Sequence, residues 1–103
     1  MRKLVVCITS LAVLSPALAQ TAAPSPSTLD KVVASKTMRV CTTGDYKPFT
    51  SLNVATGMYE GIDIDLAGSL ATSLGAKPEF VASKWATLLD DLNAGRCDIV
   101  MGA

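Results

Sequence analysis

The pattern of apolar and polar residues predicts a buried strand that stops abruptly in a polar loop. Residues 39–42 are strand-forming types, and Gly44 and Pro48 follow them closely. Gly44 permits backbone angles that other residues avoid, and Pro48 lacks a backbone N–H. The strand is therefore predicted to end near Thr43.

Further strands are predicted downstream. Residues 77–82 and 98–102 are predicted to be the second and third strands, and Pro78 is typical of a sheet edge or a strand entry. Residues 49–52 and 58–61 flank a glycine-containing turn, a pattern that predicts a hairpin.

Two short helices are predicted from apolar residues at helical spacing. The first covers residues 28–35, with Ser27 or Thr28 as its N-cap. The second covers residues 84–94, is capped by Ser83 and ends at the glycine that follows. Their predicted buried stripes are Leu29, Val32 and Val33 in the first helix and Leu88, Leu89 and Leu92 in the second.

A longer helix is predicted for residues 62–74, with Gly75 as its C-terminal cap. Its predicted core-facing stripe repeats every four residues and consists of Ile62, Leu66, Leu70 and Leu74, widened by Ala67 and Ala71. Asp63 and Asp65 stand at the start of this helix, where acidic residues favour the helix dipole and cap backbone N–H groups. A metal-binding pair is the alternative interpretation. The element order is that of a βαβ-type wind, so the predicted fold class is α/β.

Residues 1–19 have the pattern of a secretory signal peptide. Two basic residues precede an apolar run at 4–14 that is too short to span a bilayer. The small residues Ala17 and Ala19 predict cleavage after Ala19, which implies secretion machinery as a partner and a periplasmic location. An uncleaved membrane anchor is the alternative.

Residues 20–27 are rich in proline, serine and alanine and are predicted to form a linker before a domain at 28–103. The formal net charge of the chain is zero, which gives no basic surface for nucleic acid. The last residues read as a strand with nothing after it, so the chain is interpreted as a fragment.

Export would make Cys41 and Cys97 candidates for a disulfide bond, because oxidising compartments allow such bonds to persist. Each cysteine lies in or just before a predicted core strand. The bridge requires those strands to be neighbours, and two buried thiols are an equally good interpretation.

The loop after residues 39–42 is the first candidate for chemistry. In open α/β sheets ligands bind at the carboxyl ends of strands, which places Asp45 and Tyr46 where a small molecule could meet them. An ordinary polar turn is the alternative, because Gly, Asp and Pro mark loops of any function. Neither a metal site nor a cofactor is predicted.

Three motifs together resemble the periplasmic solute-binding proteins of the polar amino-acid type, family 3. They are RVCTTGDYKPF, YEGIDIDLAGSLATSLG and EFVASKWATLLDDLNAGRCDIVMG. The resemblance implies a periplasmic-binding-protein-like type II fold, in which two lobes close on a ligand. Residues 28–103 would then be the N-terminal part of the first lobe.

Within that family, TTGDYKPF and the Ser83-x-Trp85 step are most similar to the cyclohexadienyl dehydratases. That resemblance implies a lyase that removes water and carbon dioxide from prephenate or arogenate, giving phenylpyruvate or phenylalanine. The alternative within the family is a non-catalytic amino-acid receptor that delivers its ligand to an ABC permease.

The resemblance also implies site residues, namely Asp45, Tyr46, Trp85 and Gly102 as ligand contacts. Tyr46 and Trp85 would hold a ring from two sides. Lys47 or Lys84 is a possible partner for a substrate carboxylate, although solvated surface charges are the competing interpretation. The general acid is expected beyond Ala103.

Overall fold

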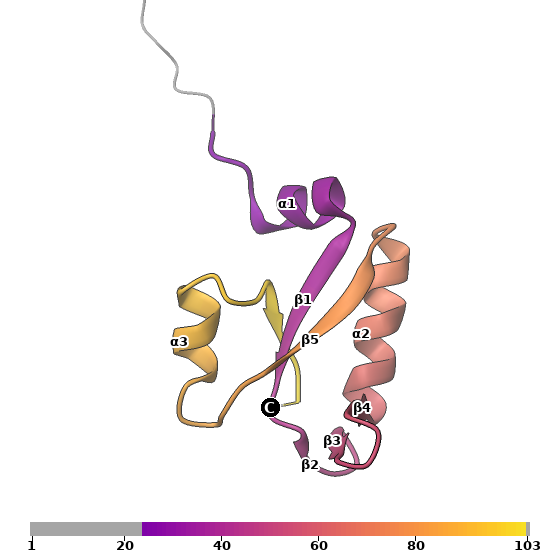
Figure 1. The fold of residues 1–103 in the computed structure, drawn as a ribbon. Coiled ribbons are helices and arrows are strands. Elements are labelled where there is room, and N and C mark those ends of the chain that lie inside the picture. The colour runs from indigo at the N-terminus through magenta and orange to yellow at the C-terminus, as the bar shows by residue number, and fades with distance from the viewer. Residues whose placement is uncertain (1–23, 103) are drawn as a thin grey trace, which may run out of the picture.

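The computed structural model describes residues 24–102. The predicted signal peptide and its cleavage after Ala19 lie outside these residues. The helices and strands are α1 (Thr28–Ser35), β1 (Thr37–Thr42), β2 (Asp45–Tyr46), β3 (Thr50–Asn53), β4 (Met58–Glu60), α2 (Ile62–Ser73), β5 (Lys77–Ala82), α3 (Leu88–Asn93) and β6 (Ile99–Val100) (Figure 1). None of the helices within 24–102 combines the length and the apolar content that crossing a bilayer needs.

The main sheet is parallel and has the order β5-β1-β6, with α2 and α3 on either side of it in Figure 1. Val40 of β1 pairs with Phe80 on one side and Ile99 on the other. This arrangement confirms the α/β prediction. Strand β1 ends at Thr42, next to the predicted end near Thr43, and Pro78 lies near the start of β5, an edge strand among those described. A central strand with both neighbours parallel is buried on both faces, which explains its apolar composition.

Alternate residues of β1 belong to two apolar clusters, because successive side chains of a strand point to opposite faces. Val40 lies in the cluster that β1 forms with α1, α2 and β5, and Cys41 in the cluster that it forms with α3. The buried members of the first cluster are Val32, Met38, Val40, Ala67, Ala71 and Ala76, and those of the second are Cys41, Leu88 and Cys97.

The predicted stripe of α2 is wrong in its rotation about the helix axis. Ala67 and Ala71 are fully buried, whereas Ile62, Leu66 and Leu70 remain exposed. A helix can approach a sheet closely only where its side chains are small, so the two alanines form the contact row and Leu66 and Leu70 turn away from the sheet. Leu74, the last residue of the predicted stripe, packs partly buried against the core. Gly75 follows α2 in a left-handed conformation, which confirms the predicted end.

Helix α1 begins as predicted, with Ser27 and Asp30 forming a reciprocal capping box. Of its predicted stripe only Val32 is buried, and Leu29 and Val33 are half exposed. The described part of the chain covers only the side of α1 that faces Met38, so a single residue per turn meets the core.

Helix α3 is shorter than predicted and begins at Leu88 instead of 84. Ser83 does not cap it, because its hydroxyl donates to the side chain of Asp91. Leu88 is buried and Leu92 partly so, but Leu89 is 71 % exposed, which corrects the predicted three-residue face. The helix ends before Gly95, as predicted.

The predicted hairpin is present as β3 and β4, and β2 adds a third strand that the pattern did not reveal. The loop between β2 and β3 meets the start of α2. There Ile62 N–H donates to Pro48 O and Asp63 N–H donates to Phe49 O, both at 3.0 Å. These carbonyl groups replace side-chain caps, so the predicted capping by Asp63 and Asp65 is wrong, although both acidic residues lie in the first turn of α2 as predicted. The residues that the structure describes also contain no group of three metal-capable side chains.

Candidate functional site

Three of the four predicted ligand contacts come together beyond the carboxyl ends of β1 and β5. Trp85 Nε1 donates to Asp45 Oδ1 at 2.9 Å. The rings of Trp85 and Tyr46 meet edge to face, with centroids 5.6 Å apart and an interplanar angle of 87°. Two elements that are 40 residues apart thus share one polar and one aromatic contact at the surface of the protein.

The aromatic rings form a corner and do not leave a slot between them. Perpendicular rings in contact cannot hold a third ring from two sides, so the expected two-sided arrangement is not present in this structure. Phe49 extends the corner, because its ring lies 5.2 Å from that of Tyr46 at 30°. All three side chains are partly exposed, with Trp85 47 % and Tyr46 46 % accessible. The corner therefore offers an open aromatic surface against which a flat ligand could lie on one side.

Gly102 is buried beside this corner and packs against Thr42 and Thr50. A Cβ atom at this position would lie 2.6 Å from Thr50 Cγ2 and 3.1 Å from Thr42 Oγ1. The two threonine hydroxyls are joined by a hydrogen bond of 2.7 Å, fully buried. Since Thr50 pairs with Tyr46 in the β2–β3 ladder, this packing links the end of β6 to the aromatic corner. Only glycine fits here without displacing the threonine pair.

The predicted carboxylate partners, Lys47 and Lys84, are both exposed. Within residues 24–102 neither ammonium group makes an ion pair or a hydrogen bond. This arrangement agrees with the interpretation of both as solvated surface charges.

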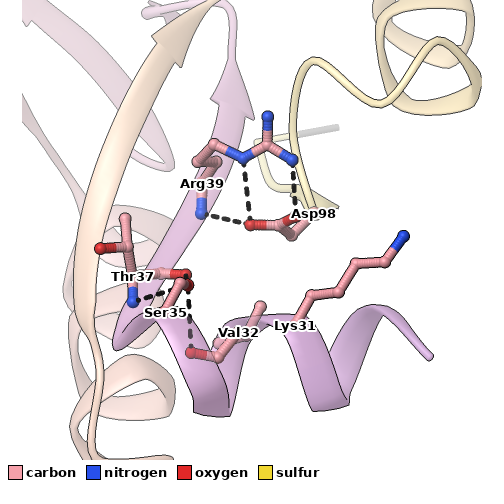
Figure 2. Close-up of a pocket in the computed structure, with 6 residues that line it drawn as sticks. All are labelled: Lys31, Val32, Ser35, Thr37, Arg39 and Asp98. Carbon is pink, nitrogen blue, oxygen red and sulfur yellow. Dashed lines mark hydrogen bonds and ion pairs between the residues drawn. The ribbon is translucent and has the colours of Figure 1, made fainter. Parts of the chain in front are cut away.

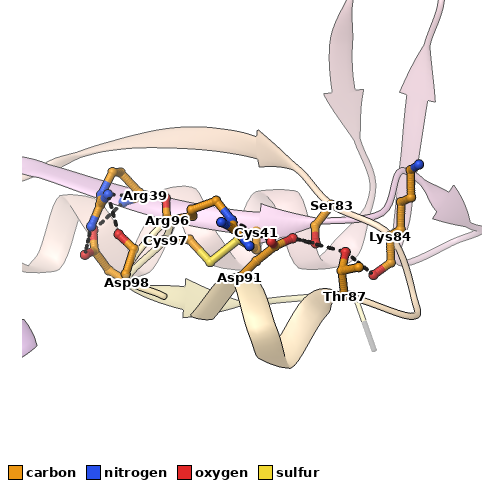
Figure 3. Close-up of a disulfide and its surroundings, with 10 residues drawn as sticks. Arg39, Cys41, Ser83, Lys84, Thr87, Asp91, Arg96, Cys97 and Asp98 are labelled. Atoms are coloured by element: carbon orange, nitrogen blue, oxygen red, sulfur yellow. Dashed lines mark hydrogen bonds and ion pairs between the residues drawn. A yellow bond between two sulfur atoms is a disulfide. The ribbon is translucent and has the colours of Figure 1, made fainter. Parts of the chain in front are cut away.

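The cysteine pair is bonded. Cys41 and Cys97 form a disulfide with Cα atoms 5.6 Å apart, so the structure has the bridge instead of two thiols. Figure 3 shows it between two ion pairs, Arg39–Asp98 on one side and Asp91–Arg96 on the other.

The first ion pair joins β1 to the segment before β6. Asp98 accepts from the Arg39 backbone N–H at 2.8 Å and from Nη2 at 2.9 Å (Figure 2). Arg39 Nη1 donates to Gly95 O at 2.8 Å. Arg39 and Lys31 line the hollow shown in Figure 2. Because the Arg39 guanidinium is already bonded to Asp98 and Gly95, it is not available to bind an anion there.

The second ion pair was not foreseen from the sequence. Asp91 Oδ1 accepts from Arg96 Nε at 2.6 Å, and Oδ2 accepts from the hydroxyls of Ser83 and Thr87. Hydrogen bonds from Ser83 and then from Arg96 lower the pKa of Asp91, with burial opposing them. The sequence signal for this cluster is the set of polar residues Ser83, Thr87, Asp91 and Arg96, spaced four or five residues apart. The same Ser83 also fits the pattern of a helix cap, which is the role that the sequence predicts for it.

Acid is expected to destabilise the protein through these two carboxylates. Burial alone would raise the pKa of Asp98, but the hydrogen bonds and charge of Arg39, with a contribution from Lys31, outweigh it and hold the pKa below its ordinary value. A folded-state pKa below the unfolded one gives stability that is present above about pH 4 and is lost as pH falls further. Calorimetric Tm values should therefore be level from about pH 7 to 5 and should fall toward pH 3.

The Asp98→Asn variant should show a smaller decrease of Tm with acid than the unmodified protein. Asp90, the exposed residue next to Asp91, makes no side-chain bond within the described residues. Asp90→Asn therefore serves as the control, and its dependence of Tm on pH should match that of the unmodified protein. Identical pH profiles for all three proteins would contradict this account of Asp98.

Comparison with known proteins assigns the chain to a family. Residues 38–103 match the sequence profile of the bacterial extracellular solute-binding proteins, family 3. This chain belongs to that family. The match covers the main sheet, the aromatic corner and the disulfide, which confirms the resemblance inferred from the motifs.

Individual relatives include both enzymes and binding proteins. The cyclohexadienyl dehydratase of Pseudomonas aeruginosa is 44% identical over 100 residues, which are 97% of this chain and 36% of that protein. A probable amino-acid ABC transporter-binding protein of Haemophilus influenzae is 37% identical over 69% of this chain and 27% of its own length. The crystal structure of an ancestral cyclohexadienyl dehydratase matches with a TM-score of 0.71 and 51% identity, over 78% of this chain and 33% of that chain. The chain thus spans about a third of the length of these relatives.

Proposed function

We propose that this chain is the N-terminal part of an exported cyclohexadienyl dehydratase, a lyase acting on prephenate or arogenate. The observation that carries the proposal is its similarity to the Pseudomonas aeruginosa dehydratase, which extends over nearly the whole chain at 44% identity. The aromatic corner supports it, because a cyclic substrate can lie against the exposed ring faces at Tyr46 and Trp85.

The described residues would contribute binding, and the acid would come from elsewhere in the protein. Loss of water from prephenate needs an acid at the departing hydroxyl and donors that hold two carboxylates. Asp45 is bonded to the Trp85 indole, an arrangement that orients the aromatic corner. We therefore assign Asp45, Tyr46, Trp85 and Gly102 to ligand contact and expect the general acid beyond Ala103. The proposal requires no cofactor.

Export is part of the same proposal. Members of this family are extracellular solute-binding proteins. A signal peptide at residues 1–19, cleaved after Ala19 by the secretion machinery, would deliver the protein to the periplasm. The disulfide agrees with this location, since such bonds persist in oxidising compartments.

A transport receptor is the second candidate, favoured by the amino-acid-binding relatives. The crystal structure of an ancestral cationic amino acid solute-binding protein matches with a TM-score of 0.69 and 48% identity. In that case the same corner would bind an amino acid and hand it to an ABC permease without chemistry.

The two functions are separated by incubating the full-length protein with prephenate and following phenylpyruvate by absorbance. We expect turnover with kcat in the usual enzyme range of about 1 to 1000 per second. A calorimetric titration with amino acids, including arginine and cystine, runs in parallel. Absence of turnover together with micromolar binding of an amino acid would establish the receptor instead.

A further inference from the structure

Trp85 projects from a short connection that has little regular structure. The connection, residues 83–87, leaves the end of β5 and enters α3 through a turn in which Thr87 N–H donates to Lys84 O at 2.9 Å. Its beginning is tied to β1, because Ser83 N–H donates to Thr42 O at 3.0 Å. Its end is held by Asp91 N–H, which donates to Thr87 O at 2.8 Å, and side-chain bonds add to this backbone order.

Those bonds converge on one carboxylate. Asp91 Oδ2 accepts from the hydroxyl of Ser83 and, at 3.3 Å, from that of Thr87, which lie two residues before and two residues after Trp85 (Figure 3). The Thr87 hydroxyl has Lys84 O as a second acceptor at 3.4 Å. Asp91 is buried, and Arg96 binds its other oxygen and offsets its charge. A buried carboxylate with all these donors in place has one favoured position, so it fixes both ends of the segment that carries Trp85.

We propose that Asp91 is a positioning residue of the ligand site, which holds the Trp85 indole against Asp45 by bonding the hydroxyls of Ser83 and Thr87. The inference deepens the proposed function and rests on it only for the choice of assay substrate. Asp91 does not touch the ligand in this account. It acts through the loop, and its effect is confined to contacts that Trp85 makes.

The other contacts of Trp85 are too weak to hold the loop alone. The Trp85–Asp45 hydrogen bond is exposed, and water competes for both partners. The edge contact with Tyr46 adds orientation but little rigidity. If Asp91 is removed, Ser83 loses its acceptor and Thr87 keeps only Lys84 O at 3.4 Å. The two ends of the connection are then no longer bonded to one group, and the indole samples several positions instead of one.

The test uses the full-length protein with prephenate and compares Asp91→Ala with Asp90→Ala. Asp90 is the adjacent residue of α3, exposed and without a side-chain bond in the described region, so both variants remove the same charge from the same helix. We expect Asp91→Ala to lower kcat/KM by about five-fold, mostly through KM, because the loop affects ligand contact and not the acid. Asp90→Ala should retain the original values within about two-fold.

A double-mutant cycle with Trp85→Ala separates positioning from general destabilisation. We expect Trp85→Ala alone to lower kcat/KM by roughly ten-fold or more. In that background Asp91→Ala should change kcat/KM by less than about two-fold, since no indole is left to position. Full additivity of the two substitutions would overturn the proposal.

A second route keeps the test decisive if Asp91→Ala does not fold, as judged by its Tm. Asp91→Asn retains the shape and can bond both hydroxyls, and Ser83→Ala with Thr87→Val removes the two donors while leaving Asp91 paired with Arg96. The donor variant should reproduce the KM increase, and Asp91→Asn should lie between it and the unmodified protein. A donor variant with unchanged KM would refute the inference.

If the protein proves to be a receptor, the same double-mutant cycle is measured as Kd for its amino acid. Failure of the proposed function and failure of this inference therefore give different results.

Discussion

Replacing Cys41 and Cys97 together with alanine is expected to lower the free energy of unfolding by about 4 kcal/mol. The bond links positions separated by 56 residues, and a cross-link of that span restricts the unfolded chain far more than the folded one. In a protein as long as the relatives, each kcal/mol shifts Tm by roughly 2–4 °C, so Tm should decrease by about 8–16 °C.

The measurement is thermal or urea unfolding of the full-length protein with and without reductant. Reduction should destabilise the unmodified protein by a similar amount and leave the double alanine variant unchanged. This comparison controls for the small packing loss at two buried positions. A double variant as stable as the oxidised protein would show that the bond contributes nothing to stability.

Substituting Gly61 with alanine is expected to destabilise the protein by about 3 kcal/mol or more. Its φ of 131° is a conformation that residues with a side chain rarely adopt. A Cβ atom would also overlap Phe49 O, the carbonyl that accepts from Asp63 N–H at the start of α2. Relief of that overlap would break the junction between the β2–β3 loop and the helix.

Gly68 supplies the matched control for this prediction. It lies inside α2, and a Cβ atom added there would meet no atom within 4 Å beyond its chain neighbours and the nearby backbone of the helix itself, so Gly68→Ala should raise stability by about 0.5–1 kcal/mol. Urea unfolding of both variants measures the contrast. Equal effects at the two positions would contradict the steric account of Gly61.

Features with a local cause were predictable from the sequence. Gly75 and Gly95 end α2 and α3 because many helices end in a left-handed residue and glycine adopts that conformation readily. Ser27 begins α1 because its partner Asp30 is three residues away. The end of β1 follows in the same way from Gly44 and Pro48. Each of these signals lies within a few residues of its effect.

Features that depend on tertiary contacts were not predictable in this way. Which face of α2 is buried depends on how closely the helix approaches the sheet, a distance that the spacing of leucines does not encode. Strand β2 consists of only two residues, Asp45 and Tyr46, and forms because β3 lies beside it. Ser83 has the composition of a cap, yet a carboxylate eight residues later accepts its hydrogen bond.

The candidate site divides along the same line. The motifs indicated Asp45, Tyr46 and Trp85, and their meeting at the ends of β1 and β5 follows from the rule for parallel sheets. The perpendicular orientation of the rings and the role of Asp91 depend on side-chain directions in space. The disulfide required knowledge that β6 lies next to β1, which the order of elements alone leaves open.

The disulfide also makes a closed covalent ring of residues 41–97. The exposed turn between β3 and β4 lies within this ring, and its Val54 side chain is 90% accessible. A protease that cuts the backbone once at this turn leaves both pieces attached to each other through sulfur. Strand β1 and the start of α2 would then remain at high effective concentration after cleavage, since the bridge still tethers them. The fold is thereby protected against the loss of either piece when this exposed turn is cut.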